Sequence, residues 1–119
     1  MKSFIFYIFS LISISTYGQT DCNLLTGKFS SYREAVSKIE NAKFTLKETV
    51  NTSRSSWVRS ASFYSCDKKF GYFIINTDKH NYIYKNLPVK IWYDFKIATS
   101  YGSYFNSKIK NRYEFYLTK

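Results

Sequence analysis

The sequence predicts an α+β fold built around a small antiparallel β-meander. Three segments rich in β-branched and aromatic residues, at about 57–65, 70–76 and 80–85, are separated by short polar turns. The segments on either side of this block repeat their apolar residues with helical spacing instead. With 119 residues, the chain has room for one small domain of this kind.

The first 18 residues have the pattern of a secretory signal peptide. Lys2 precedes an apolar run from Phe4 to Ile14, and small or polar residues follow as far as Gly18. The run is shorter than the roughly 20 residues that cross a bilayer, which disfavours the alternative of an uncleaved membrane anchor. Cleavage after Gly18 lowers the formal net charge from +10 to +9. We therefore expect a secreted or periplasmic protein with no transmembrane span in the mature chain.

The mature chain keeps two cysteines, Cys22 and Cys66. An even pair in an exported protein is more often a disulfide than two free thiols. Such a bridge would connect the start of the mature chain to the middle of the domain. A metal site is not expected, because two thiols and one distant histidine make a poor ligand set.

Residues 19–54 are predicted to form an extension with a helix followed by a strand. Ser31 and Glu34 have the spacing of a capping box, which starts a helix at about 31–42. The apolar stripe of this helix is Tyr32, Ala35, Val36 and Ile39. Residues 44–50 then alternate apolar and polar side chains, which indicates a strand, although a continued helix is the alternative.

Within the meander, alternation assigns side chains to faces. Phe73 and Ile75 are expected to share one face of the second strand, with Tyr72 and Ile74 on the other. In the third strand, Tyr82 and Tyr84 share a face across Ile83. The turns between the strands are Asp67-Lys68-Lys69 and Thr77-Asp78-Lys79.

Two short helices are predicted after the meander. Pro88 suits the first turn of a helix at about 88–99, because its missing amide costs nothing there. Gly102-Ser103 breaks this helix and begins a second one at about 103–110, in which Phe105 and Ile109 recur at helical spacing. Residues from Tyr113 to Leu117 are expected to be extended or irregular.

The order of these signals resembles the KTSC domain family, named for a C-terminal domain of some lysyl-tRNA synthetases. The resemblance covers about 55–116 and rests on Ser55-Ser56-Trp57-Val58, Tyr82-Ile83-Tyr84, Leu87-Pro88, Gly102-Ser103-Tyr104-Phe105-Asn106, Ile109 and Arg112-Tyr113. The family has no settled biochemical function, so the resemblance implies a fold more than an activity. Together with the leader pattern, it divides the chain into a signal peptide (1–18), the extension (19–54) and a KTSC-like domain (55–116).

The sequence argues against an enzyme. The single histidine, His80, lies in a polar turn, and neither a Gly-x-Ser-x-Gly elbow nor a glycine-rich phosphate loop is present. The carboxylates are scattered along the chain, and Cys66 could act as a nucleophile only if it were unpaired. We therefore predict a non-catalytic protein without a cofactor.

The basic and aromatic composition points to an anionic partner, such as a nucleic acid or an acidic envelope polymer. Residues 79–119 carry eight lysines and arginines against only Asp94 and Glu114. The predicted contacts are Tyr82, Tyr84, Tyr104, Lys108, Lys110 and Arg112. The alternatives are that the tyrosines belong to the core and that the lysines serve solubility. A second hypothesis is a protein-interaction or effector module that binds a protein partner through a sheet edge or through 22–54.

Overall fold

The computed structural model describes residues 20–25 and 27–113, so the signal-peptide prediction lies outside the described residues. Four strands form an antiparallel sheet in the order β3-β4-β5-β6. Their bounds are β3 (Leu46–Val50), β4 (Val58–Ser65), β5 (Phe70–Thr77) and β6 (Asn81–Pro88). The three predicted strands of the meander are therefore confirmed. The strand expected at 44–50 joins them as the edge strand β3, and the helical alternative for this segment is wrong.

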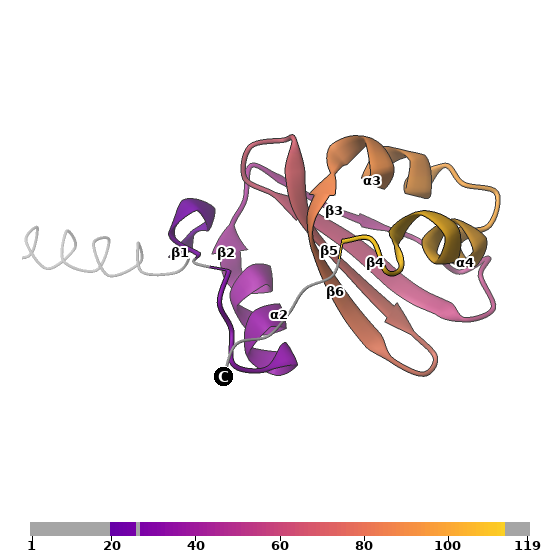
Figure 1. The fold of residues 1–119 in the computed structure, drawn as a ribbon, viewed down its shortest axis with the longest axis horizontal. Coiled ribbons are helices and arrows are strands. Elements are labelled where there is room, and N and C mark those ends of the chain that lie inside the picture. The colour runs from indigo at the N-terminus through magenta and orange to yellow at the C-terminus, as the bar shows by residue number, and fades with distance from the viewer. Residues whose placement is uncertain (1–19, 26, 114–119) are drawn as a thin grey trace, which may run out of the picture.

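Helices cover both faces of the sheet (Figure 1). Helix α2 (Tyr32–Asn41) lies on one side, in the segment expected to be helical. On the other side are α3 (Val89–Lys96), α4 (Tyr101–Tyr104) and the π-helix η2 (Phe105–Ile109). Among the described residues, no helix is long and apolar enough to cross a membrane.

Each face of the sheet has its own apolar core, and the predicted alternation assigns residues to them correctly. Phe73, Ile75 and Tyr84 belong to the larger core under α3 and η2, where Trp92 and Phe95 are fully buried. Ile74 and Ile83 belong to the smaller core under α2. The pairing of Phe63 with Phe73, and of Phe73 with Tyr84, brings the first set together across three strands. Burial on both faces explains why these strands are so apolar.

The boundaries of the two C-terminal helices differ from the prediction at three places. Helix α3 ends at Lys96 instead of about residue 99, and the start of each helix also differs. Pro88 is the last residue of β6 and the N-cap of α3, with an extended ψ of 142°, so it precedes the first turn instead of lying in it. The second helix begins at Tyr101, where the Ser100 hydroxyl accepts a hydrogen bond from the Ser103 amide at 3.2 Å. It then continues as a π-helix, which the sequence pattern did not indicate.

The capping of α2 is only partly as expected. The Ser31 hydroxyl accepts from the Glu34 amide at 3.1 Å, as in a capping box. The Glu34 carboxylate, however, accepts from the amide of Ser30 at 2.9 Å, one residue earlier than the motif requires. The Ser30 side chain and then its amide, followed by Lys38, hold the pKa of Glu34 at about 2.

The extension contains further elements that the sequence did not suggest. β1 (Thr20–Asp21) pairs in parallel with β2 (Ala42–Lys43), and η1 (Cys22–Leu24) is a single 3₁₀ turn between β1 and the rest of the extension. The predicted disulfide is present: Cys22 in η1 is bonded to Cys66, which follows β4, and their Cα atoms are 5.9 Å apart. The bridge fastens the first residues of the extension to the end of β4, while the extension's own strand β3 is paired with β4 directly.

Glu48 connects β3 to α3, and we predict that Glu48→Ala lowers the free energy of unfolding by about 1–3 kcal/mol. Its Oε1 atom accepts from the Trp92 indole N–H at 2.7 Å and from the Lys96 ammonium at 2.8 Å. The Trp92 ring is fully buried, so the variant leaves its N–H without an acceptor. Urea denaturation at pH 7 measures the difference.

The matched control is Glu48→Gln, which keeps an acceptor and should lose less stability. The hydrogen bond from Lys96, and next that from Trp92, hold the pKa of Glu48 below its usual value near 4.5. Its ionised form therefore stabilises the fold above about pH 4.5, and this contribution is lost as the pH falls. Equal acid sensitivity of the wild type and Glu48→Gln would contradict this assignment.

Candidate functional site

A groove of about 260 Å³ opens at the end of the sheet formed by the β5–β6 turn. It combines residues far apart in the sequence: Trp57 before β4, the turn after β5, Tyr82 of β6, and residues of η2 and its C-cap. The complete lining is Trp57, Thr77, Asp78, Lys79, His80, Tyr82, Phe105, Asn106 and Lys110. Aromatic rings, an amide and two lysines are thus gathered at one place.

Aromatic rings form one side of this groove. The Phe105 ring lies 6.2 Å from the rings of both Trp57 and Tyr82, measured between centroids. His80 continues the row, with its ring 6.0 Å from that of Tyr82. Trp57 and Tyr82 are half-buried, whereas Phe105 is buried, so the first two offer ring surface while the third supports them.

Backbone contacts fix Trp57 at the groove. The Ser55 hydroxyl accepts from the Val58 amide at 3.0 Å, which holds the chain as it enters β4. The Trp57 carbonyl accepts from the Asp78 amide at 2.9 Å and so joins the ring's backbone to the β5–β6 turn. The indole also lies directly against Gly102 of α4, where an added Cβ would be 2.6 Å from its Nε1 atom. Only glycine permits this approach.

The β5–β6 turn is a rigid wall. The Thr77 hydroxyl donates to the His80 carbonyl at 2.7 Å and accepts from the His80 amide at 2.9 Å. The Thr77 amide also donates to the His80 carbonyl, at 2.8 Å. These bonds hold Lys79 and His80 in fixed backbone positions, and both side chains are exposed.

The charges around the groove are predominantly positive. Lys79 of the β5–β6 turn and Lys110 at the C-cap of η2 both line it, and Asp78 is the acidic residue of the lining. Lys108 and Arg112 are exposed within two residues of Lys110, although they do not line the groove. The Lys110 amide donates to the Phe105 carbonyl at 2.9 Å, which closes η2 and sets the direction of this basic segment.

The structure brings together some of the predicted contact residues. Tyr82 and Lys110 line the groove. Tyr84 is 6 % exposed and packs in the core against Phe105 at 5.7 Å, so the interpretation of Tyr84 as a surface contact is wrong. Tyr104 is half-buried against Phe95 and lies outside the groove. Burial, and then the nearby Asp94, raise the pKa of Tyr104.

Sequence reasoning missed Trp57, Lys79 and Asn106 as groove residues and treated His80 as an ordinary turn residue. His80 is indeed exposed, but it also lines the groove. A signal was available, because Trp57, Tyr82, Phe105 and Asn106 all belong to the spaced set that carried the family resemblance. The sequence did not show that this set meets at one place.

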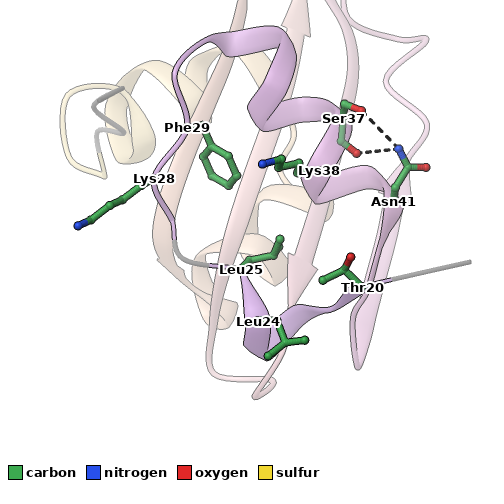
Figure 2. Close-up of a pocket in the computed structure, with 8 residues that line it drawn as sticks. All are labelled: Thr20, Leu24, Leu25, Lys28, Phe29, Ser37, Lys38 and Asn41. Atoms are coloured by element: carbon green, nitrogen blue, oxygen red, sulfur yellow. Dashed lines mark hydrogen bonds between the residues drawn. The ribbon is translucent and has the colours of Figure 1, made fainter. Parts of the chain in front are cut away.

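A second hollow, of about 320 Å³, lies between the extension's first turn and α2 (Figure 2). Phe29 and Leu25 form its apolar part, while Lys28 points away from it. On the helix side the Asn41 amide donates to the Ser37 carbonyl at 2.8 Å, and the Lys38 ammonium is paired with Glu34 at 3.0 Å. These polar groups are therefore already engaged within the helix.

A metal centre is not formed by the one cluster of candidate ligands in the described part of the chain. Asp21, Cys22 and Cys66 bring a carboxylate and two sulfur atoms together within 4.8 Å. Both sulfur atoms are joined in the disulfide, so neither is a thiolate that could bind an ion.

Together these features define a small α+β module with an aromatic and basic groove. Residues 73–113 match the family model of the KTSC domain, which confirms the resemblance over this range. The match begins within β5 and contains Tyr82, Phe105, Asn106 and Lys110, whereas Trp57 and the extension lie before it. The search of the curated proteins gives no match, and neither does the search of the solved structures.

Proposed function

We propose that this protein is an exported, non-catalytic binding module that holds an anionic polymer, a nucleic acid or an acidic envelope polymer, in the groove at the β5–β6 turn. The observation that carries the proposal is the meeting of half-buried Trp57 and Tyr82 rings with the exposed Lys79 and Lys110. Lysines neutralise phosphate or carboxylate groups, and rings stack on bases or sugars.

The small volume of the groove favours recognition of one unit of a chain at a time. About 260 Å³ is below the usual size of a site that encloses a drug-sized ligand. One base or one sugar would occupy the aromatic wall. The neighbouring charged groups of the polymer would then reach Lys110, with Lys108 and Arg112 further along the same segment.

The disulfide supports the exported part of the proposal. Bridges of this kind persist in oxidising compartments and are rare in the cytosol. Cys22 and Cys66 are bonded, which is compatible with a secreted or periplasmic location and with the signal peptide expected at 1–18.

The contacts made by the potentially catalytic side chains support the proposal that the module is not an enzyme. Cys66, the best nucleophile in the sequence, is bonded to Cys22. Glu34, Glu48 and Asp94 each pair with a lysine, at 3.0, 2.8 and 2.9 Å. The pKa values of Glu34 and Glu48 lie below their usual range, and a carboxyl group that stays ionised is a poor general acid.

Binding to a dT20 single strand and to polygalacturonate should weaken steeply with salt, following a straight line in log–log form. The double variant Lys79→Gln/Lys110→Gln should lower the magnitude of the slope for dT20 by about 1.4, the expected change for two lost contacts to a single strand. Fluorescence anisotropy between 50 and 300 mM NaCl measures both quantities.

The control is Lys43→Gln/Lys68→Gln, which removes the same charge from two exposed lysines outside the groove. It should change the slope much less than the groove variant. A salt-independent affinity, or equal losses in the two double variants, would refute the proposed site. Tighter binding to dT20 would identify a nucleic acid as the partner, and tighter binding to polygalacturonate would identify an acidic glycan.

The second candidate function, a protein-interaction module, is favoured by the position of β3. This strand pairs with β4 on one side, and no other described strand pairs with its outer edge. An extended peptide could add to such an edge through backbone hydrogen bonds. Binding of this kind would persist at 0.5 M NaCl and would be insensitive to the groove lysines, unlike the polymer binding proposed above.

A further inference from the structure

A separate pocket of about 370 Å³ lies at the opposite end of the β4–β5 hairpin from the groove, beside the disulfide. The extension forms one wall with Cys22, Asn23 and Leu25, and the sheet forms the other with residues around the β4–β5 turn. Since the matched family segment begins at residue 73, most of this pocket comes from parts of the chain that precede it.

The sheet side of this pocket is aromatic. Phe44 packs against Tyr64 at 5.6 Å and against Tyr72 at 6.3 Å, measured between ring centroids. Phe70 lies at the same pocket with 51 % of its surface exposed, so its ring is accessible to a ligand there. The pocket thus has an aromatic wall and one aromatic side chain largely open to solvent.

Polar atoms beside these rings have unused hydrogen-bonding capacity. In the described part of the chain, the side-chain NH₂ groups of Asn23 and Asn86 and the Oδ2 atom of Asp67 have no hydrogen-bond partner. The other carboxylate oxygen of Asp67 accepts from the amides of Lys69 at 2.8 Å and Phe70 at 3.0 Å, so the side chain is fixed in orientation. Asn86 has a positive φ of 60° and lies at the irregular step in the β5–β6 pairing, where it lines the pocket.

The geometry points to this pocket as a binding site for an uncharged pyranose unit of a glycan. The C–H face of a sugar ring packs on an aromatic ring, and its hydroxyl groups both donate and accept. Phe70 would supply the ring, Asn23 and Asn86 the donors, and Asp67 the acceptor. The pocket volume lies within the range of small-molecule sites.

An uncharged ligand fits this pocket better than a polyanion. The amides of Phe70 and Lys69 hold the pKa of Asp67 below its usual value, so the carboxylate stays negative. A phosphate or uronate would be repelled where it lies directly beside this carboxylate. Lys85 also lines the pocket, so Asp67 and Lys85 leave it without net charge, whereas the groove has two lysines and one aspartate. This inference does not depend on the function proposed for the groove.

The test is an NMR titration of the mature chain, with its disulfide intact, against chitotetraose, cellotetraose and maltotetraose. We expect at least one tetrasaccharide to shift the amide resonances of Phe70, Gly71 and Asn86 saturably, with the same affinity in 0.5 M NaCl. Phe70→Ser should weaken binding about tenfold or more, as the loss of an aromatic anchor does. Asn23→Ala, in an exposed turn, is a second variant that should weaken it with little effect on folding.

The matched control is Tyr93→Ser, which removes an aromatic side chain of similar exposure, 45 %, from α3. It should leave glycan binding unchanged, as should Lys79→Gln/Lys110→Gln in the groove. The inference is overturned if no tetrasaccharide gives saturable shifts, if the shifts centre on Tyr82, or if the Phe70 and Asn23 variants bind like the wild type. Because the tetrasaccharides are uncharged, a negative result in this titration would leave the proposed polyanion binding at the groove unaffected, and the reverse also holds.

Discussion

Replacement of both cysteines, Cys22→Ser/Cys66→Ser, is expected to lower the free energy of unfolding by about 4 kcal/mol. The bridge joins residues separated by 44 positions. In the chain-entropy model a closed loop of that length removes this much conformational freedom from the unfolded chain. Such a loss is a large fraction of the stability of a domain of this size.

The loss of stability should differ from one part of the molecule to another. Residues 20–43 of the extension reach the four-stranded sheet through the bridge and through α2 and its small core, because the two-residue β1–β2 pair lies within them. In contrast, β4, β5 and β6 are held by α3 and the larger core. Hydrogen exchange should therefore rise first in η1 and β1 and last in β5. The comparison is urea denaturation of the double variant against wild type with and without reductant. Equal midpoints for the oxidised and reduced wild type would contradict the prediction.

The parts of the fold that the sequence predicted are those with a strong local period. In β5 the alternation of Phe73 and Ile75 with Tyr72 and Ile74 fixes which core each side chain enters, because a slip of one residue would reverse both faces. The apolar stripe of α2 is equally clear. The polar runs between strands are short, so consecutive strands had to be neighbours in the sheet.

The parts that could not be predicted depend on tertiary contacts. The β1–β2 pair has two residues per strand and no period at all. Tyr84 was misread because alternation shows that it shares a face with Tyr82 but not how deeply that face is covered. Phe105 and its neighbours in η2 bury Tyr84 near the middle of the sheet and leave Tyr82 open at its end.

The groove was incompletely predicted for the same reason. Its lysines were sought where the charge is densest in sequence, in 108–112, but Lys79 comes from a turn that appeared to be an ordinary surface loop. The turn reaches the groove because Trp57 is bonded to it through the Asp78 amide and rests on Gly102. The sequence pattern predicts neither of these two contacts, although Trp57 and Gly102 both belong to the set of residues that carried the family resemblance.

The second large effect is expected for Gly71→Ala, which should lower the free energy of unfolding by about 3 kcal/mol or more. Gly71 pairs with Ser65 on one side and with Leu87 on the other, next to the irregular step in the β5–β6 register. An added Cβ there would overlap the carbonyl oxygen of Tyr64 and lie 2.8 Å from Cζ of Phe63. A glycine in a strand that admits another backbone so closely cannot be replaced without separating the strands.

Gly102→Ala is the informative comparison, because its Cβ would overlap the Trp57 indole to a similar degree. The obstacle at Gly102 is a half-buried side chain that can rotate, whereas the obstacle at Gly71 is a carbonyl held by the ladder of the central strands. We therefore expect Gly102→Ala to cost about 1–2 kcal/mol and to move Trp57 out of the groove. Urea midpoints should show the larger loss for Gly71→Ala, and tryptophan fluorescence of the folded state should change for Gly102→Ala. Equal midpoints would mean that the sheet end at Gly71 relaxes as readily as a side chain, which would also weaken the case for a rigid pocket beside Phe70.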